Sequence, residues 1–220
     1  KNTISLACVD DTISLFVNGL QVAVAIDQKP IYGDVGFSVG NYSDDNTTVD
    51  FTQFKVYGVE GNELITKAQD LPFTNLIQSD MPYEQASYFY QNDLLSEEDA
   101  QKVRMGETEN YKASFEDGKY LLTLKQPTRY VTSVTSSLNY MDMVVNVTAV
   151  EFDPEGAVGV VCRYQSTTNL YGFDISQDGW ATIYKYINGK YTELYGEYHE
   201  NVISEYANTI VATCVDDMLT

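Results

Sequence analysis

Apolar and polar residues alternate with a period of two along much of this chain, which is typical of β-strands buried on one face. Ile13 to Val17 alternates in this way, and a second alternating stretch runs from Gln21 to Ile26 after Asn18-Gly19. The Asn-Gly pair predicts a β-hairpin, because a type I′ turn needs positive φ at both central residues. Further strands are expected at 33–40, 49–58, 120–124, 141–150, 157–164, 170–175, 180–187 and 191–195.

One short helix is expected at about 96–105. Ser96-Glu97-Glu98-Asp99 resembles a capping box and places acidic side chains at the positive end of the helix dipole. Elsewhere, many short strands are separated by turn signals such as Asp117-Gly118 and Asn188-Gly189. This pattern predicts an all-β fold, an antiparallel β-sandwich with a single short helix.

One stretch of the chain occurs twice. Residues 2–11 read Asn-Thr-Ile-Ser-Leu-Ala-Cys-Val-Asp-Asp, and residues 208–217 read Asn-Thr-Ile-Val-Ala-Thr-Cys-Val-Asp-Asp, so seven of ten positions are identical at an offset of 206 residues. Both copies predict a strand that ends in an Asp-Asp turn. Self-similarity at a fixed offset is typical of repeat proteins. Chance identity over ten residues is the alternative explanation.

The charge of the chain excludes some classes of partner. Acidic residues outnumber basic ones by 32 to 13, which gives a net charge of −19. Nucleic acids and anionic membranes are therefore not expected as partners, because there is no cationic surface to release counterions from phosphates. No apolar run reaches the roughly 18 residues of a membrane span. The acidic surface suits an extracellular protein that holds calcium, or it serves only to keep the protein in solution.

Three cysteines leave one without a partner inside the chain. Cys8 and Cys214 occupy the same place in the repeat, so each period contains two cysteine positions, the second being Cys162. We hypothesise a disulfide between Cys162 and Cys214, with Cys8 bonded to the equivalent of Cys162 in a preceding unit. The alternative is a cytosolic protein with three buried thiols.

Several strand motifs together resemble a known superfamily. They are Gly159 to Tyr164 (Gly-Val-Val-Cys-Arg-Tyr), Tyr171-Gly172-Phe173-Asp174-Ile175, the Leu15 to Gly19 hairpin, Gly33 to Phe37, and Val49 to Val56. Their pattern resembles the concanavalin A-like lectin/glucanase jelly roll, in its laminin-G-like form. The resemblance implies a jelly-roll sandwich, and it says little about function because this fold hosts lectins, hydrolases and inert modules.

The order of the motifs is rotated relative to that superfamily. Residues 1–58 resemble the C-terminal half of a jelly-roll sandwich, residues 59–80 form a connector, and residues 81–220 resemble the N-terminal half. Two arrangements fit this rotation: residues 1–58 fold back on 81–220 of their own chain, or they complete a neighbouring copy. The duplicated strand favours the second arrangement, because an open half-sandwich exposes strand edges that must be covered.

No catalytic residue is expected. Glu151-Phe152-Asp153-Pro154-Glu155 superficially resembles the Glu-x-Asp-x-x-Glu core of laminarinase-type glycosidases on this fold, where carboxylates about 5 Å apart cleave the glycosidic bond. Here Pro154 predicts a turn rather than a strand, and the spacing is one residue short. His199 is the single histidine, and no nucleophile elbow is present. A glycoside hydrolase is therefore only a third alternative.

Two binding sites are candidates. Calcium is the expected cofactor, because Asp44, Asp45 and Asp50 lie in or beside a polar loop and supply hard oxygen ligands. A glycan would need aromatic side chains on one sheet face, and Trp180, Tyr184 and Tyr186 share a face by their spacing. The alternative is that this face packs on the other sheet or on a neighbouring subunit. The full candidate set for glycan binding is Tyr171, Trp180, Tyr184, Tyr186, Tyr191 and Tyr195.

These observations predict a non-catalytic, extracellular β-sandwich repeat or subunit. It would assemble head-to-tail with other copies of itself by strand complementation, and so build a surface filament or adhesive array. The alternative is a glycan-binding, lectin-like module whose strand order has been permuted.

Overall fold

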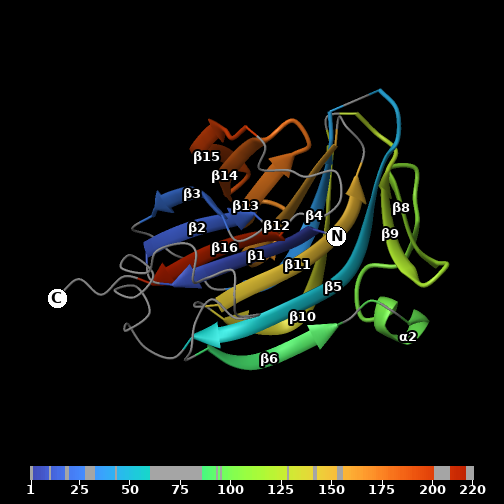
Figure 1. Cartoon of the computed structure of the whole chain (residues 1–220), viewed down its shortest axis with the longest axis horizontal. Helices are drawn as coiled ribbons and strands as arrows, with labels where there is room; N and C mark the ends of the chain where they lie inside the picture. The colour runs from blue at the N-terminus through green and yellow to red at the C-terminus, as the bar shows by residue number, and fades with distance from the viewer. Residues whose placement is uncertain are drawn as a thin grey trace.

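The protein is an antiparallel β-sandwich of two sheets with one short helix in the described part, as the alternation predicts (Figure 1). The computed structural model describes residues 2–9, 11–17, 20–27, 33–42, 44–59, 86–92, 94, 96–127, 129–140, 143–152, 156–200 and 209–216. Most of the predicted connector at 59–80 lies outside these residues.

The larger sheet has ten strands in the described part of the chain. Its order is β3-β2-β1-β16-β11-β5-β9-β8-β7, and β6 pairs with β5 off this path. The strands are β1 (Asn2–Val9), β2 (Asp11–Val17), β3 (Leu20–Ile26), β5 (Thr47–Val59), β6 (Ala86–Asn92), β7 (Gly106–Glu107), β8 (Tyr111–Glu116), β9 (Lys119–Leu124), β11 (Met143–Phe152) and β16 (Thr209–Asp216).

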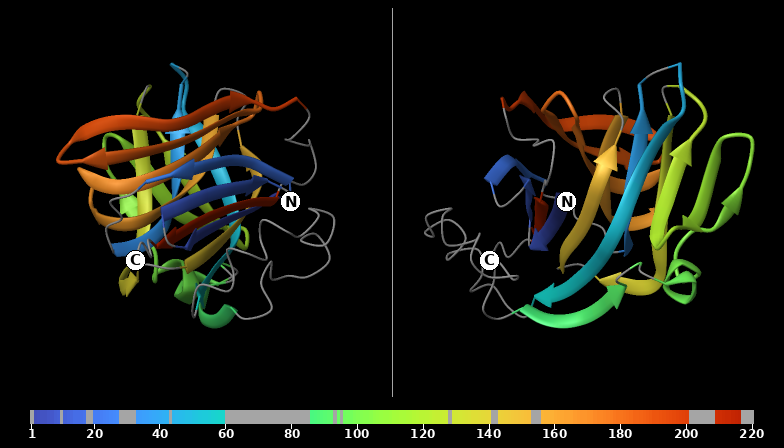
Figure 2. Two further views of the ribbon diagram at one scale, coloured as in Figure 1. Left: turned by 90° about the vertical axis from the view of Figure 1, so that its left-hand side faces the viewer. Right: turned by 45° about the vertical axis from the view of Figure 1, so that its right-hand side comes forward.

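The smaller sheet has six strands and lies behind the larger one in Figure 1; Figure 2 shows the two layers from the side. Its order is β10-β4-β12-β13-β14-β15. The strands are β4 (Gly33–Asn41), β10 (Arg129–Tyr140), β12 (Gly156–Ser166), β13 (Asn169–Ser176), β14 (Trp180–Ile187) and β15 (Lys190–Tyr198).

Strands from the two sequence halves interleave in both sheets. In the smaller sheet, β4 lies between β10 and β12, with Val39 opposite both Val131 and Val158. In the larger sheet, β5 lies between β11 and β9. Residues 1–58 therefore supply central strands that residues 86–200 lack, so the two halves are complementary parts of one sandwich within this chain.

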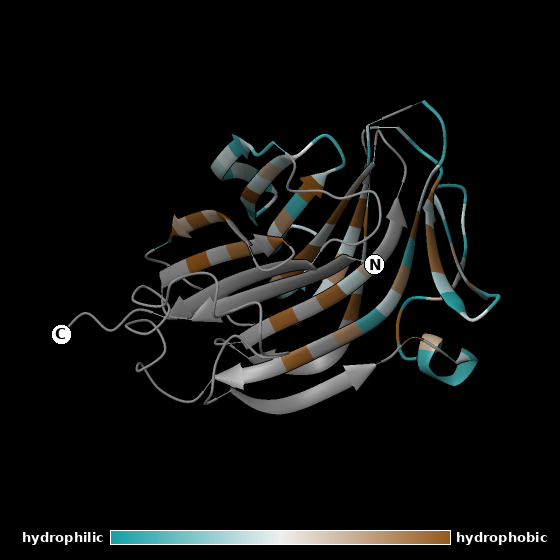
Figure 3. Ribbon diagram, in the orientation of Figure 1, coloured by the Kyte–Doolittle hydropathy of each residue, from teal (hydrophilic) through white to brown (hydrophobic). Residues whose placement is uncertain are grey.

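The core fills the space between the sheets. Apolar and polar residues alternate along β5 in Figure 3, and the apolar residues Val49, Phe51, Phe54 and Val56 of this strand are fully buried. Phe37, Phe51 and Tyr120 are fully buried at the centre of the core. The Phe37 ring centroid lies 4.4 Å from that of Phe51 and 5.7 Å from that of Tyr120. Such aromatic pairs add about 0.5–1.5 kcal/mol each beyond the area that they bury.

The helix is present but shorter than predicted. Helix α2 spans Glu97–Ala100, and the Ser96 side chain caps it by accepting a hydrogen bond from the Asp99 amide at 3.1 Å. After Ala100 the backbone changes to i→i+3 bonds, from the amide of Lys102 to the Asp99 carbonyl and from that of Val103 to the Ala100 carbonyl. This tighter turn ends the helix before residue 105.

Turns form where the sequence predicts them. Asn188 and Gly189 both have positive φ, 52° and 76°, as a type I′ turn between β14 and β15 requires. Asp117 and Gly118, between β8 and β9, also both have positive φ. Asn18 and Gly19 lie outside the described residues, although the strands on either side of them pair antiparallel, as a hairpin requires.

Candidate functional site

The two copies of the repeated stretch pair with the same strand in the same register. On β1, Ile4 lies opposite Val147 of β11, and on β16 the equivalent residue Ile210 also lies opposite Val147. Leu6 and its equivalent Ala212 both lie opposite Val145. The register therefore follows the sequence repeat residue by residue.

Both copies also pair with β2, the strand on the side away from β11. Thr12 of β2 pairs with Val9 of the first copy and with Val215 of the second. The two copies also lie parallel to each other, with Thr3 beside Thr209. We call the position between β2 and β11 the shared slot.

Geometry allows only one complete strand in the shared slot. Neighbouring strands lie about 4.7–4.9 Å apart, and each strand edge offers one row of backbone hydrogen-bonding groups. A second strand cannot form full ladders with both β2 and β11 while the first does so. The two copies therefore compete for the same partners: β1 pairs with β11 and along β2, whereas β16 pairs with β11 and with only two residues of β2.

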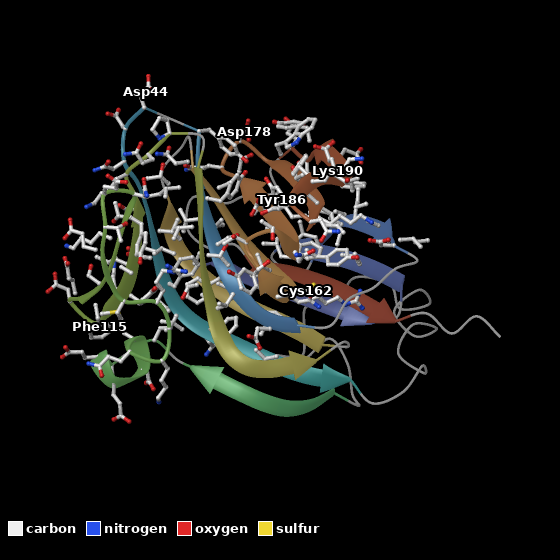
Figure 4. The ribbon with its side chains drawn as sticks, turned by 180° about the vertical axis from the view of Figure 1, so that it is seen from behind. Asp44, Phe115, Cys162, Asp178, Tyr186 and Lys190 are labelled. Carbon is white, nitrogen blue, oxygen red and sulfur yellow. The ribbon has the colours of Figure 1, made fainter. Side chains whose placement is uncertain are left out.

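A second candidate site is a pocket on the outer face of the smaller sheet, the face turned away from the core. Its volume is about 780 Å³, within the range of roughly 300–1,000 Å³ that is usual for small-molecule sites. Figure 4 views the molecule from this side, with Tyr186 among the side chains that cover the pocket strands. The lining residues are Tyr42, Tyr130, Thr132, Thr167, Leu170, Asp174, Trp180, Thr182, Tyr184, Tyr186, Tyr191 and Glu193. We call this the tyrosine pocket.

Alternation along β13 sends side chains to opposite faces. Tyr171, Phe173 and Ile175 belong to the core between the sheets, whereas Asp174 lines the pocket. Gly172 lies opposite Tyr184, and a Cβ at this glycine would come within 2.2 Å of the Tyr184 ring. The missing side chain is what lets the Tyr184 ring lie against the sheet.

Asp174 is buried at the pocket, with only 4% of its surface exposed. Its Oδ1 accepts a hydrogen bond from the Ser38 hydroxyl at 3.2 Å, whereas its Oδ2 accepts none from the described residues. Burial raises the pKa of Asp174 to about 7. Contacts with the hydroxyls of Ser38, Tyr184 and Tyr130 offset only part of this rise in pKa. Burial therefore favours the neutral, protonated form of the carboxyl.

Gly159→Ala is expected to destabilise the fold by about 3 kcal/mol, because overpacking a filled site costs this much. A Cβ at Gly159 would lie 2.0 Å from Asp174 Oδ1 and 2.1 Å from the Phe173 carbonyl oxygen. Gly196→Ala is the matched control, since its Cβ would meet only the flexible Glu193 side chain, at 2.9 Å. Urea unfolding should show a loss below about 1 kcal/mol for this control. Equal losses for both variants would contradict the packing described.

The residues predicted to bind a glycan are divided between the two faces of the smaller sheet. Trp180, Tyr184 and Tyr186 line the tyrosine pocket, together with Tyr191 from the wider set. Tyr171 lies on the inner face, fully buried, and its hydroxyl donates to Asp27 Oδ2 at 2.6 Å. Tyr195 is not among the lining residues and packs against the core.

Other pocket residues were not anticipated from sequence. Tyr42 and Tyr130 come from the end of β4 and the start of β10, far from β14 in the chain, and Asp174 had no predicted role. Asp174 could have been predicted as a pocket residue from the alternation along β13, which places it on the same face as Gly172.

The residues proposed as calcium ligands are not gathered into one group. Asp44 and Asp45 are exposed at the β4–β5 loop, where Figure 4 labels Asp44 at the tip. Asp50 forms an ion pair with Lys119 at 2.5 Å. Within the described residues no cluster of three or more metal-ligating side chains is found.

The cysteines lie in different sheets. Cys162 belongs to β12 and is fully buried in the core, and burial raises the pKa of its thiol. Cys8 and Cys214 lie on β1 and β16, both opposite Met143. No disulfide is formed among the side chains that the structure describes, which do not include those of Cys8 and Cys214.

The remaining candidate residues lie outside any described site. Residues 153–155 of the glycosidase-like stretch are outside the described part of the chain, between the end of β11 and the start of β12. The ring Nε2 of His199 lies 3.5 Å from the Tyr195 hydroxyl. No helix in the described ranges is long and apolar enough to cross a membrane.

No protein-family model matches the sequence, and no curated protein sequence matches it.

Proposed function

We propose that this chain is a unit of a non-catalytic, extracellular head-to-tail array in which each β-sandwich is completed by strand complementation. The observation that carries the proposal is the shared slot: two segments 206 residues apart pair with β11 and β2 in one register. One position with two interchangeable occupants is what a periodic array needs at the junction between units.

The interleaving of the two halves supports the same proposal. Strands β2 to β5 follow the first copy in the chain and complete both sheets around residues 86–200. If the sequence continued with the same period, equivalents of β2 to β5 would directly follow β16. The sandwich would then be completed from the next period instead of from residues 1–58. Each sandwich would then be built from strands of two successive periods, and the array would grow in one direction. The surface filament and the pairing of cysteines between units belong to this proposal.

A chain with its segments in rotated order tests whether one period of the proposed repeat forms a complete sandwich. In it, residues 81–206 are followed directly by residues 1–58, so the slot has one occupant. We expect a compact monomer at least as stable as the 220-residue chain, measured by sedimentation and urea unfolding. A rotated chain in which residues 10–58 replace 1–58 lacks the slot strand and is expected to be unfolded. A rotated chain that fails to fold, or a control as stable as the rotated chain, would contradict the proposal.

The tyrosine pocket favours a second candidate function, that of a binding module. This function is compatible with an array, because the pocket lies on the smaller sheet whereas the shared slot lies in the larger one. An array of such units would present the same pocket once per period. The glycan expected from the sequence is one possible ligand class.

A further inference from the structure

We propose that the tyrosine pocket binds an organic ammonium ion with an apolar body, held over the tyrosine rings and paired with Asp174. The proposal goes beyond the array and does not depend on it. It is based on the charge of the lining, the arrangement of the rings, and one buried oxygen atom.

The charge of the lining favours a cation. Among the described lining residues there are two carboxyl groups, on Asp174 and Glu193, and no Lys, Arg or His. The chain as a whole carries a net charge of −19, which raises the local concentration of cations. An anionic ligand would meet no compensating charge among these side chains.

Five tyrosine rings of the lining pack against one another. The centroid of the Tyr184 ring lies 6.2 Å from that of Tyr130, 6.0 Å from that of Tyr186 and 5.6 Å from that of Tyr191. Tyr42 joins this group, with its ring centroid 6.1 Å from that of Tyr130. Aromatic rings that line a pocket can attract a quaternary ammonium group, because the ring faces carry negative charge.

Asp174 supplies the counter-ion. The residue is 4% exposed, and its Oδ2 is buried without a hydrogen bond of normal geometry, although the Tyr184 and Tyr130 hydroxyls lie near the carboxyl. A buried carboxyl oxygen in this state is costly, and a cation placed beside it removes much of that cost.

Isothermal titration calorimetry on the intact chain tests the proposal with matched probes. Choline and benzyltrimethylammonium are the cations, and 3,3-dimethyl-1-butanol is the neutral isostere of choline. We expect both cations to bind, and the alcohol to bind at least tenfold more weakly than choline. Asp174→Asn keeps the shape of the side chain and should weaken cation binding at least tenfold.

Two further variants separate binding from folding. Trp180→Ala removes a half-exposed ring at the rim, so the fold should persist while cation binding weakens severalfold. Ile26→Ala, at an exposed position in β3 of the larger sheet, should leave binding unchanged. The proposal is overturned if neither cation binds, if the alcohol binds as tightly as choline, or if Asp174→Asn has no effect. It is also overturned if neutral β-glucan oligosaccharides bind and the cations do not.

Discussion

A chain that carries both Leu6→Pro and Ala212→Pro is expected to lose more than about 4 kcal/mol of stability, whereas either substitution alone should cost less than about 1 kcal/mol. Both positions lie opposite Val145 of β11, one on each copy of the repeated stretch. Proline removes a donor from the ladder and disrupts a central strand. With one copy disabled, the other still fills the shared slot. With both disabled, the slot is empty and the facing edges of β2 and β11 are unpaired.

The size of the effect follows from what the slot strand covers. Val145 and Val147 of β11 and Leu15 of β2 are fully buried beside it. Loss of the strand removes two hydrogen-bonded ladders and exposes this apolar surface. We expect a loss above about 4 kcal/mol, a large part of the roughly 5–15 kcal/mol of a typical domain.

Urea unfolding followed by circular dichroism measures the coupling between the two substitutions. The expected coupling exceeds about 2 kcal/mol, because the double variant should lose far more than the sum of the single losses. The control pair is Leu6→Pro with Thr192→Pro, since Thr192 is in β15 of the other sheet, and its effects should add. The account would be contradicted if the losses for Leu6→Pro and Ala212→Pro add, or if one proline alone unfolds the protein. Either result would show that the two copies do not replace each other in the shared slot.

Asp174→Asn is expected to stabilise the protein above pH 7 and to have little effect near pH 4. Burial raises the pKa of this carboxyl from 3.8 to about 7 in the folded state. The folded protein therefore binds a proton more tightly than the unfolded chain, and stability falls as pH rises through this interval. Integrated over the interval, ionised Asp174 costs up to about 4 kcal/mol, which the neutral amide avoids.

The measurement is the free energy of unfolding of both proteins at several pH values between 4 and 8. Other groups that face Asp174 do not account for the expected trend: burial raises the pKa of Tyr42 to about 12 and also raises those of Tyr130 and Tyr184. Asp178 and Glu193 remain carboxyls in the variant, so their contribution cancels in the comparison. Asp44→Asn, at an exposed position, is the control and should show no gain. A gain that is the same at pH 4 and pH 8 would contradict a raised pKa.

Local patterns predicted most of the strands, because alternation and turn residues are properties of adjacent residues. Strand β10 was missed: its sequence, Arg-Tyr-Val-Thr-Ser-Val-Thr-Ser-Ser-Leu-Asn-Tyr, is rich in Ser and Thr and lacks a clear apolar face. Its place at the edge of the smaller sheet explains why it can be so polar.

The tyrosine pocket was only partly predictable for a different reason. Trp180, Tyr184 and Tyr186 share a face because they are two residues or four residues apart on one strand. Tyr130 and Asp174 join them only through the order of strands β10, β4, β12, β13 and β14, which depends on long-range pairing. The shared slot was easier to anticipate, since its evidence is an identity between two segments of the sequence itself.

Disulfide trapping tests most directly whether the two copies are alternates for one position. Met143 lies opposite both Cys8 and Cys214, and opposed residues of an antiparallel pair have a Cα separation of about 4.5–5.5 Å, within disulfide range. In a Met143→Cys variant oxidised under dilute conditions, peptide mapping should find the new thiol at position 143 bonded to Cys8 in some molecules and to Cys214 in others. Adding Cys8→Ser or Cys214→Ser should raise the yield of the remaining bond. A bond to one of these cysteines in every variant, and never to the other, would contradict the shared slot.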